Sequence, residues 1–136
     1  MEKEFINYEE ALALKELGFN KPCLGYYTGD TMHFVLRSLI LRINELESYV
    51  VTAPLYQQTF RWFREKYNLD GSITIDVWNT KKAYWRITGG IENIIFVNNS
   101  NELYDWESGY FNTYEETELD CLKKLIEIVK NDNKAN

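Results

Sequence analysis

The 136-residue sequence has only two cysteines, two prolines and one histidine. Because Cys23 and Cys121 are its only thiols, one chain cannot form a four-cysteine zinc site, and a disulfide would be unusual in a reducing compartment. Because His33 is the only imidazole, sites that need two or more histidines are excluded within one chain. We therefore expect no metal site and no cofactor, and we interpret both cysteines as small buried apolar residues.

Long apolar runs are also missing. No run approaches the roughly 18 apolar residues that span a bilayer, and the start, Met1 to Phe5, lacks the apolar stretch of a secretory signal. We expect a cytoplasmic protein that does not bind membranes. The net charge of −6 disfavours a protein that coats nucleic acid through its overall field. One segment differs, since residues 61–88 carry six Lys or Arg and only three Asp or Glu.

Apolar and aromatic residues, by contrast, are plentiful. Hydrophobic residues make up 45% and aromatic residues 15% of the chain, which is enough to build a core without a staple. The length fits one domain. We predict a single domain over residues 1–130, with a frayed tail at 131–136.

Three helices are predicted from caps and apolar spacing. Asn7 and Glu10 form a capping box for the first helix, which ends at Gly18. The second runs from Leu55 to Tyr67 after Pro54, and the third begins with a capping box of Thr113 and Glu116. The predicted buried stripes are Tyr56, Phe60, Phe63 and Tyr67 on the second helix, and Leu119, Leu122, Ile126 and Val129 on the third.

Alternating runs predict the strands. Cys23 to Tyr27 and Thr31 to Arg37 form a hairpin, and residues 73–78, 83–88 and 91–97 form a three-stranded meander. Residues 36–47 fit a strand or a helix, of which we favour the strand, and residues 98–112 are predicted to be a loop. The fold class is therefore α+β, with three helices packed on a mostly antiparallel sheet, in the order N-terminal helix, β-hairpin, helix, three-stranded meander, C-terminal helix.

No catalytic signature is present. The chain has no glycine-rich phosphate loop, and a lone strand histidine such as His33 is typical of packing or of a surface position. Asp76 could pair with Asp105 or Glu107 for acid–base work, but nothing in their spacing requires it. We name no catalytic residue and rank an enzyme of unknown type third among the functional hypotheses.

Three blocks of the sequence resemble a known family. They are Ala53–Tyr67 (APLYQQTFRWFREKY), Tyr8–Phe19 (YEEALALKELGF) and Tyr114–Val129 (YEETELDCLKKLIEIV). They are similar to a family of short uncharacterised proteins from phages, prophages and mobile elements of gut Bacteroidetes. The resemblance implies that genetic setting, but it implies no activity, catalytic residue, ligand or partner.

The leading hypothesis is a non-enzymatic accessory protein of a phage or mobile element that binds a host or phage protein. Amides and guanidinium groups make directional hydrogen bonds, and an indole anchors interfaces. The predicted binding residues are Gln57, Gln58, Arg61 and Arg64 on the outward face of the second helix, with Trp62 at the edge of that face. The identity of the partner and the oligomeric state are not predicted.

A second hypothesis is single-stranded nucleic-acid binding through the basic, aromatic segment 61–88. Stacking needs exposed aromatic faces and local positive charge. Beyond the second helix, the residues that favour this hypothesis are Lys81, Lys82, Tyr84, Trp85 and Arg86.

Overall fold

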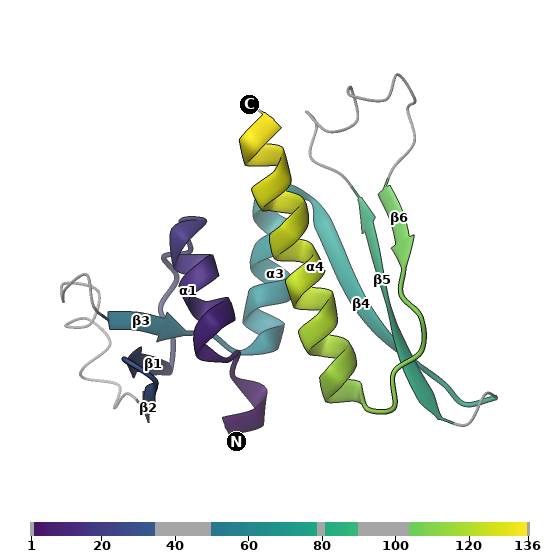
Figure 1. Cartoon of the computed structure of the whole chain (residues 1–136), viewed down its shortest axis with the longest axis horizontal. Coiled ribbons are helices and arrows are strands. Elements are labelled where there is room, and N and C mark those ends of the chain that lie inside the picture. Colours follow the sequence, from purple (N-terminus) through teal and green to yellow (C-terminus); the bar gives the residue numbers. More distant parts are fainter. Residues whose placement is uncertain (1, 35–49, 79–80, 90–103, 136) are drawn as a thin grey trace. The chain divides into compact units, whose positions relative to one another are not determined.

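The computed structural model describes residues 2–34, 50–78, 81–89 and 104–135 (Figure 1). The chain divides into two compact units, Met1–Thr59 and Phe60–Asn136, with the boundary inside helix α3 (Tyr56–Tyr67). The described residues form three α-helices and two three-stranded antiparallel sheets, which confirms the α+β class and the predicted order of its elements. The expectation of one sheet is corrected, because each unit has its own.

The first unit has its strands in the order β2-β1-β3. The predicted hairpin is confirmed, with Thr28 opposite Thr31. Strand β3 was not predicted, and the prediction for residues 36–47 lies outside the described residues. The elements are a short 3₁₀ helix at Glu2–Glu4, α1 (Tyr8–Glu16), β1 (Gly25–Thr28), β2 (Thr31–Phe34) and β3 (Val50–Ala53).

Local chemistry explains where α1 begins and ends. The Asn7 side chain accepts a hydrogen bond from the Glu10 N–H at 3.2 Å, so the predicted N-cap is confirmed. Gly18 follows the helix with a φ of 92°, which a residue with a side chain rarely adopts. Beyond it, the buried Tyr27 hydroxyl donates to the Ile6 carbonyl at 2.9 Å, which ties β1 to the segment before α1.

His33 has a packing role in this unit. Its ring stacks on Tyr26 with 5.0 Å between centroids, and its Nε2 lies 2.8 Å from the Thr28 hydroxyl oxygen. These contacts agree with the prediction that His33 lies in a strand and serves packing or a surface position.

The second unit has its strands in the order β4-β5-β6. The antiparallel pairing of the first two predicted strands is confirmed, and the predicted third strand at 91–97 lies outside the described residues. A strand at Tyr104–Glu107 replaces part of the predicted loop 98–112, so that prediction was wrong there. The elements after α3 are β4 (Leu69–Asp76), β5 (Lys82–Gly89), β6 (Tyr104–Glu107) and α4 (Tyr114–Ala135).

Helix α4 packs on β4 and β5, and close approach at Gly71 makes this possible. A Cβ at Gly71 would lie 3.0 Å from the Cys121 sulfur and 3.1 Å from Leu125 Cδ1. All three helices were expected to pack on one sheet, whereas among the described residues α4 makes most of the helix contacts to this one. The apolar side chains buried in this unit include Phe63, Leu69, Trp85, Ile87, Cys121, Leu122, Leu125 and Val129.

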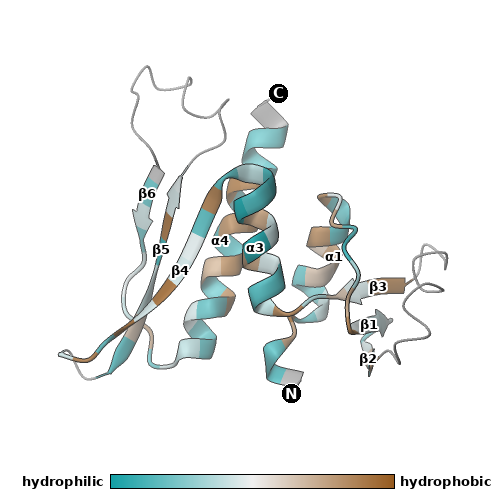
Figure 2. Cartoon of the chain, turned by 180° about the vertical axis from the view of Figure 1, so that it is seen from behind, coloured by the Kyte–Doolittle hydropathy of each residue, from teal (hydrophilic) through white to brown (hydrophobic). Residues whose placement is uncertain are grey.

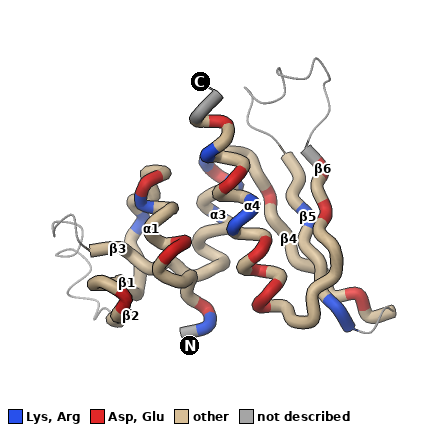
Figure 3. The backbone as a smooth tube through the Cα atoms, in the orientation of Figure 1, with Lys and Arg blue, Asp and Glu red and all other residues tan. Residues whose placement is uncertain are grey.

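The ends of α4 differ in how well they were predicted. The Thr113 hydroxyl accepts from the Glu116 N–H at 3.1 Å, which confirms the predicted cap. Acidic residues in the first turns (Figure 3) suit the positive end of the helix dipole. The helix continues to Ala135, further than the sequence indicated. Within the described ranges, no helix is both long and apolar enough to cross a membrane.

Candidate interaction surface

The predicted helix face lies on α3, and three of its side chains contact other residues of the chain. Arg61 Nε lies 2.7 Å from Glu65 Oε1, and Arg64 Nη1 lies 3.5 Å from Asp70 Oδ1. The Gln58 amide donates to the Pro22 carbonyl at 2.7 Å. Both guanidinium groups are exposed, so a partner could displace these contacts at small cost. Binding by Gln57, Gln58, Arg61 and Arg64 stays a prediction.

Trp62 does not belong to an outward face. It is 4% exposed, and its ring packs edge-to-face on Phe63 and Tyr67 at 5.1 and 5.4 Å. Lys66 Nζ lies 5.0 Å from its ring centroid. The buried face of α3 is formed by Thr59, Trp62 and Phe63, whereas the predicted Tyr56, Phe60 and Tyr67 are only half-buried. Trp62 therefore belongs to the core. Its indole is not available as an interface anchor, and that part of the predicted site is corrected.

The basic, aromatic segment also has less free surface than the sequence suggested. Trp85 is buried, and its indole N–H donates to Asp120 Oδ2 at 2.7 Å. Arg86 makes a two-pronged contact with Asp105 at 2.7 and 2.6 Å, which raises the pKa of the guanidinium and lowers that of the carboxyl. Trp62 and Trp85 therefore offer no face on which a base could stack.

A different cluster of apolar side chains is exposed at the end of the β4–β5 hairpin. Trp78 is 95% exposed, Val77 71% and Ile75 49%. Tyr110, 51% exposed, lies next to them through a hydrogen bond to Asp76. We call Ile75, Val77, Trp78 and Tyr110 the hairpin surface. The end of the β4–β5 hairpin is seen at the lower left of Figure 2. Exposed Lys81 and Lys82 follow at the start of β5.

Asp76 holds the base of the hairpin surface. One carboxylate oxygen accepts the Trp78 backbone N–H at 3.0 Å, and the other accepts the Tyr110 hydroxyl at 3.0 Å. Such a side-chain bond to the backbone two residues on is typical of an aspartate that fixes a turn. The backbone that carries Trp78 is therefore anchored, although its indole is in solvent.

Two further contacts brace the same region. Tyr110 packs edge-to-face on Tyr84 of β5 at 5.7 Å. The next residue, Phe111, exchanges two backbone hydrogen bonds with Ala83, at 3.0 and 2.7 Å. The segment before α4 is thus attached to β5, and these contacts hold the exposed Tyr110 in place.

This surface was not predicted from the sequence, because the first strand of the meander was expected to run from residue 73 to residue 78. The alternation of Ile73, Ile75 and Val77 predicts one buried face along the whole run. In the structure β4 ends at Asp76, and Val77 and Trp78 form a turn. The signal that could have found it is Asp76 two residues before Trp78, which favours a turn there.

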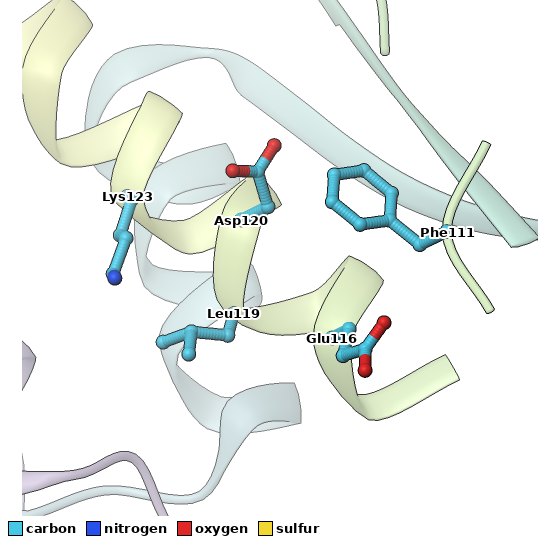
Figure 4. Close-up of a pocket in the computed structure, with 5 residues that line it drawn as sticks. All are labelled: Phe111, Glu116, Leu119, Asp120 and Lys123. Carbon is cyan, nitrogen blue, oxygen red and sulfur yellow. The ribbon is translucent and has the colours of Figure 1, made fainter. Parts of the chain in front are cut away.

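A shallow hollow of about 250 Å³ lies beside α4 (Figure 4). Its side chains are those of Phe111, Glu116, Leu119, Asp120 and Lys123. The Glu116 and Asp120 carboxylates point in different directions, and Asp120 accepts the Trp85 indole N–H. Across the described ranges, no group of three or more His, Cys, Asp or Glu side chains is placed to hold a metal ion.

Both cysteines are buried thiols without a disulfide. Burial raises the pKa of Cys23 and of Cys121 to about 12 in each case. A thiol with so high a pKa is a poor nucleophile at neutral pH. Their interpretation as small core residues is confirmed by this burial.

Comparison of the chain with protein-family models, curated proteins and solved structures gives no match. The phage or mobile-element setting therefore gains no support from relatives.

Proposed function

We propose that this chain is a non-enzymatic accessory protein of a phage or mobile element that binds another protein through the hairpin surface. The observation that carries the proposal is the 95% exposure of Trp78 beside exposed Val77. Tryptophan is enriched among the residues that dominate binding energy at protein interfaces. A partner that covers Trp78 and Val77 would remove an apolar area that water now solvates.

The anchored turn supports the same proposal. Binding loses free energy when a mobile segment must be ordered, and that loss is smaller when the backbone is held beforehand. The bonds of Asp76 to the Trp78 N–H and the Tyr110 hydroxyl hold it in this way. Two charged residues of the same hairpin, Lys81 and Lys82, are also exposed.

The test compares protein capture from cells of the source organism by four tagged forms of the full chain. The forms are the wild type, Trp78→Ser, Leu24→Ser and the double variant Arg61→Ala/Arg64→Ala. Leu24 is a matched control because it is a large apolar residue, 55% exposed, in the other unit. We expect Trp78→Ser to lose a protein that the wild type and Leu24→Ser retain.

Two results would change the proposal. Loss of the captured protein only in the arginine double variant would move the site to the predicted face of α3. Equal capture by all four forms, with each form folded by circular dichroism, would refute a protein-binding role for the hairpin surface.

Single-stranded nucleic-acid binding is the second candidate, because Trp78 lies in the same hairpin as Lys81 and Lys82. An exposed ring and nearby positive charge are what base stacking and phosphate contact require. Fluorescence anisotropy with labelled oligonucleotides at low salt tests it, since the electrostatic contribution is largest there. If neither DNA nor RNA binds under these conditions, this candidate is eliminated.

A further inference from the structure

The edge of the second sheet is formed by β4, since β5 lies between β4 and β6. The hydrogen bonds on the side of β5 away from β4 show which way each backbone group of β5 points. Ala83 exchanges its N–H and carbonyl bonds with Phe111. Trp85 donates its N–H to the Ser108 hydroxyl and accepts from the Ser108 N–H. Because these directions alternate along a strand, Lys82 and Tyr84 direct theirs towards β4.

The register between β4 and β5 shows which backbone groups of β4 face β5 and which face outward. Thr74 lies opposite Tyr84 and Asp76 opposite Lys82, so their backbone groups bond to β5. Ile73 and Ile75 lie opposite Trp85 and Ala83, so their N–H and carbonyl groups point to the outer edge. Among the residues that the structure describes, no partner for these outward groups is seen.

Between Asp70 and Asp76, the side chains along this edge do not protect it. In natural proteins, a charged residue, a proline or a bulge commonly prevents an edge strand from pairing with another chain. Residues 71–75 are Gly-Ser-Ile-Thr-Ile, without charge or proline, and their pairing with β5 is continuous. Ile75 is half exposed, and the strand leads directly into Val77 and Trp78.

We propose that β4 binds one extended segment of a partner protein as an added strand, with hydrogen bonds to the backbone of Ile73 and Ile75. This inference rests on the proposed function and supplies its mode of binding. The fitting segment alternates, with apolar side chains on the side of Ile73 and Ile75 and polar side chains on the side of Ser72 and Thr74. Strand addition gives affinity through the backbone and specificity through these alternate positions.

A second copy of this chain fits the edge less well. Antiparallel pairing centred on Ile73 would set Asp70 opposite Asp76 of the other copy. Like charges directly opposite one another destabilise a strand pair. The net charge of −6 on each copy acts in the same direction.

Amide hydrogen exchange on the full chain tests whether the edge is open. We expect the amides of Ile73 and Ile75 to exchange faster than those of Thr74 and Asp76, which are bonded to β5. Equal protection of all four amides would mean that the edge is already covered, and would overturn the proposal.

Binding is tested with linear peptides selected on the wild type from a displayed random library. Ile75→Pro removes both the isoleucine side chain and the outward backbone N–H. Ile75→Ala removes the same side chain but keeps the N–H, so it is the matched control. Proline is tolerated at an edge position whose N–H faces solvent, so Ile75→Pro should fold, whereas Thr74→Pro should unfold the sheet. We expect the selected peptides to bind Ile75→Pro at least about tenfold more weakly than Ile75→Ala.

Each other outcome overturns strand addition. These outcomes are no enriched peptide, equal affinity for the proline and alanine variants, and a concentration-dependent dimer of the chain that Ile75→Pro abolishes. The capture experiment with Trp78→Ser separates the two proposals. Capture that depends on Trp78 but not on the Ile75 N–H would retain protein binding and refute the added strand.

Discussion

The indole N–H of Trp85 donates to the Asp120 carboxylate at 2.7 Å, and this bond joins the middle strand of the second sheet to α4. The two residues are 35 positions apart in the sequence. The indole itself is buried, so its N–H needs an acceptor inside the protein. Asp120 also lines the hollow beside α4, together with Phe111 (Figure 4).

Replacing Asp120 by alanine should lower the free energy of unfolding by about 1–3 kcal/mol, because the indole N–H is left without its acceptor. Asp120→Asn keeps an oxygen that can accept, and should lower it less. Urea denaturation of the two variants makes the comparison. Equal losses would show that the negative charge of Asp120, and not its acceptor oxygen, stabilises the fold.

Substitution of three glycines by alanine should give three graded effects. Gly89 has a φ of 105°, and a Cβ there would lie 2.0 Å from the Asn68 carbonyl oxygen. Gly89→Ala should therefore cost about 4 kcal/mol or more. Gly29 has a φ of 61° and open space around its Cα, so Gly29→Ala should lower the free energy of unfolding by about 1 kcal/mol. A Cβ at Gly109 would also meet open space, so Gly109→Ala should leave the stability almost unchanged. Thermal melts that reverse this order would contradict the backbone geometry.

Phe63→Ala should cost about 3–5 kcal/mol, because Phe63 is fully buried in the core of the second unit. Trp62→Ala should be comparably damaging, which an interface residue on an outward face would not be. Denaturation curves of the two variants test this. A Trp62→Ala protein as stable as the wild type would restore Trp62 to the predicted binding face.

The double variant Arg61→Ala/Arg64→Ala should keep the unfolding temperature of the wild type. Both arginines are more than half exposed, and their partners Glu65 and Asp70 are as well. Exposed ion pairs contribute little because water and salt screen them. A clear drop in the melting temperature would assign these arginines a structural role.

Stability should fall in alkaline solution. In the unfolded chain the thiols ionise near their ordinary pKa of 9, whereas burial raises the pKa of Cys121 to about 12 in the folded state. Between these values the folded state binds more protons, so the free energy of unfolding decreases as pH rises. Denaturation series above pH 9 should show the decrease, and Cys121→Ala should reduce its slope. Neither thiol should react with a soluble disulfide reagent at pH 8 unless the protein is unfolded.

The helix boundaries and the first hairpin could be predicted from the sequence because they depend on neighbours in the chain. Asn7 and Thr113 cap the helices through the N–H groups three residues on. The Thr28–Thr31 turn forms between directly consecutive strands. Each of these bonds spans a few residues, so the information needed for it is local.

The short strands β3 and β6 could not be predicted in this way. Each has four residues and is paired only with a strand that is distant in the sequence. The β6 alternation of Tyr104 and Trp106 with two acidic residues is too short to outweigh the Asn- and Ser-rich composition before it. Tertiary pairing therefore decided that these residues are strands.

The amino-acid sequence by itself determined the α+β class, the caps and most of the buried face of α4, where Leu122, Ile126 and Val129 are buried as predicted. Only the tertiary structure decided which tryptophan is buried and which is exposed. Trp62 lies beside a core phenylalanine on a helix and is 4% exposed, whereas Trp78 directly follows a strand-like alternation and is 95% exposed. Local periodicity gives the direction of a side chain, but burial requires a second element opposite it. For Trp78 the strand ends at Asp76 and the chain turns, so that in the part of the protein the structure describes its indole remains in solvent.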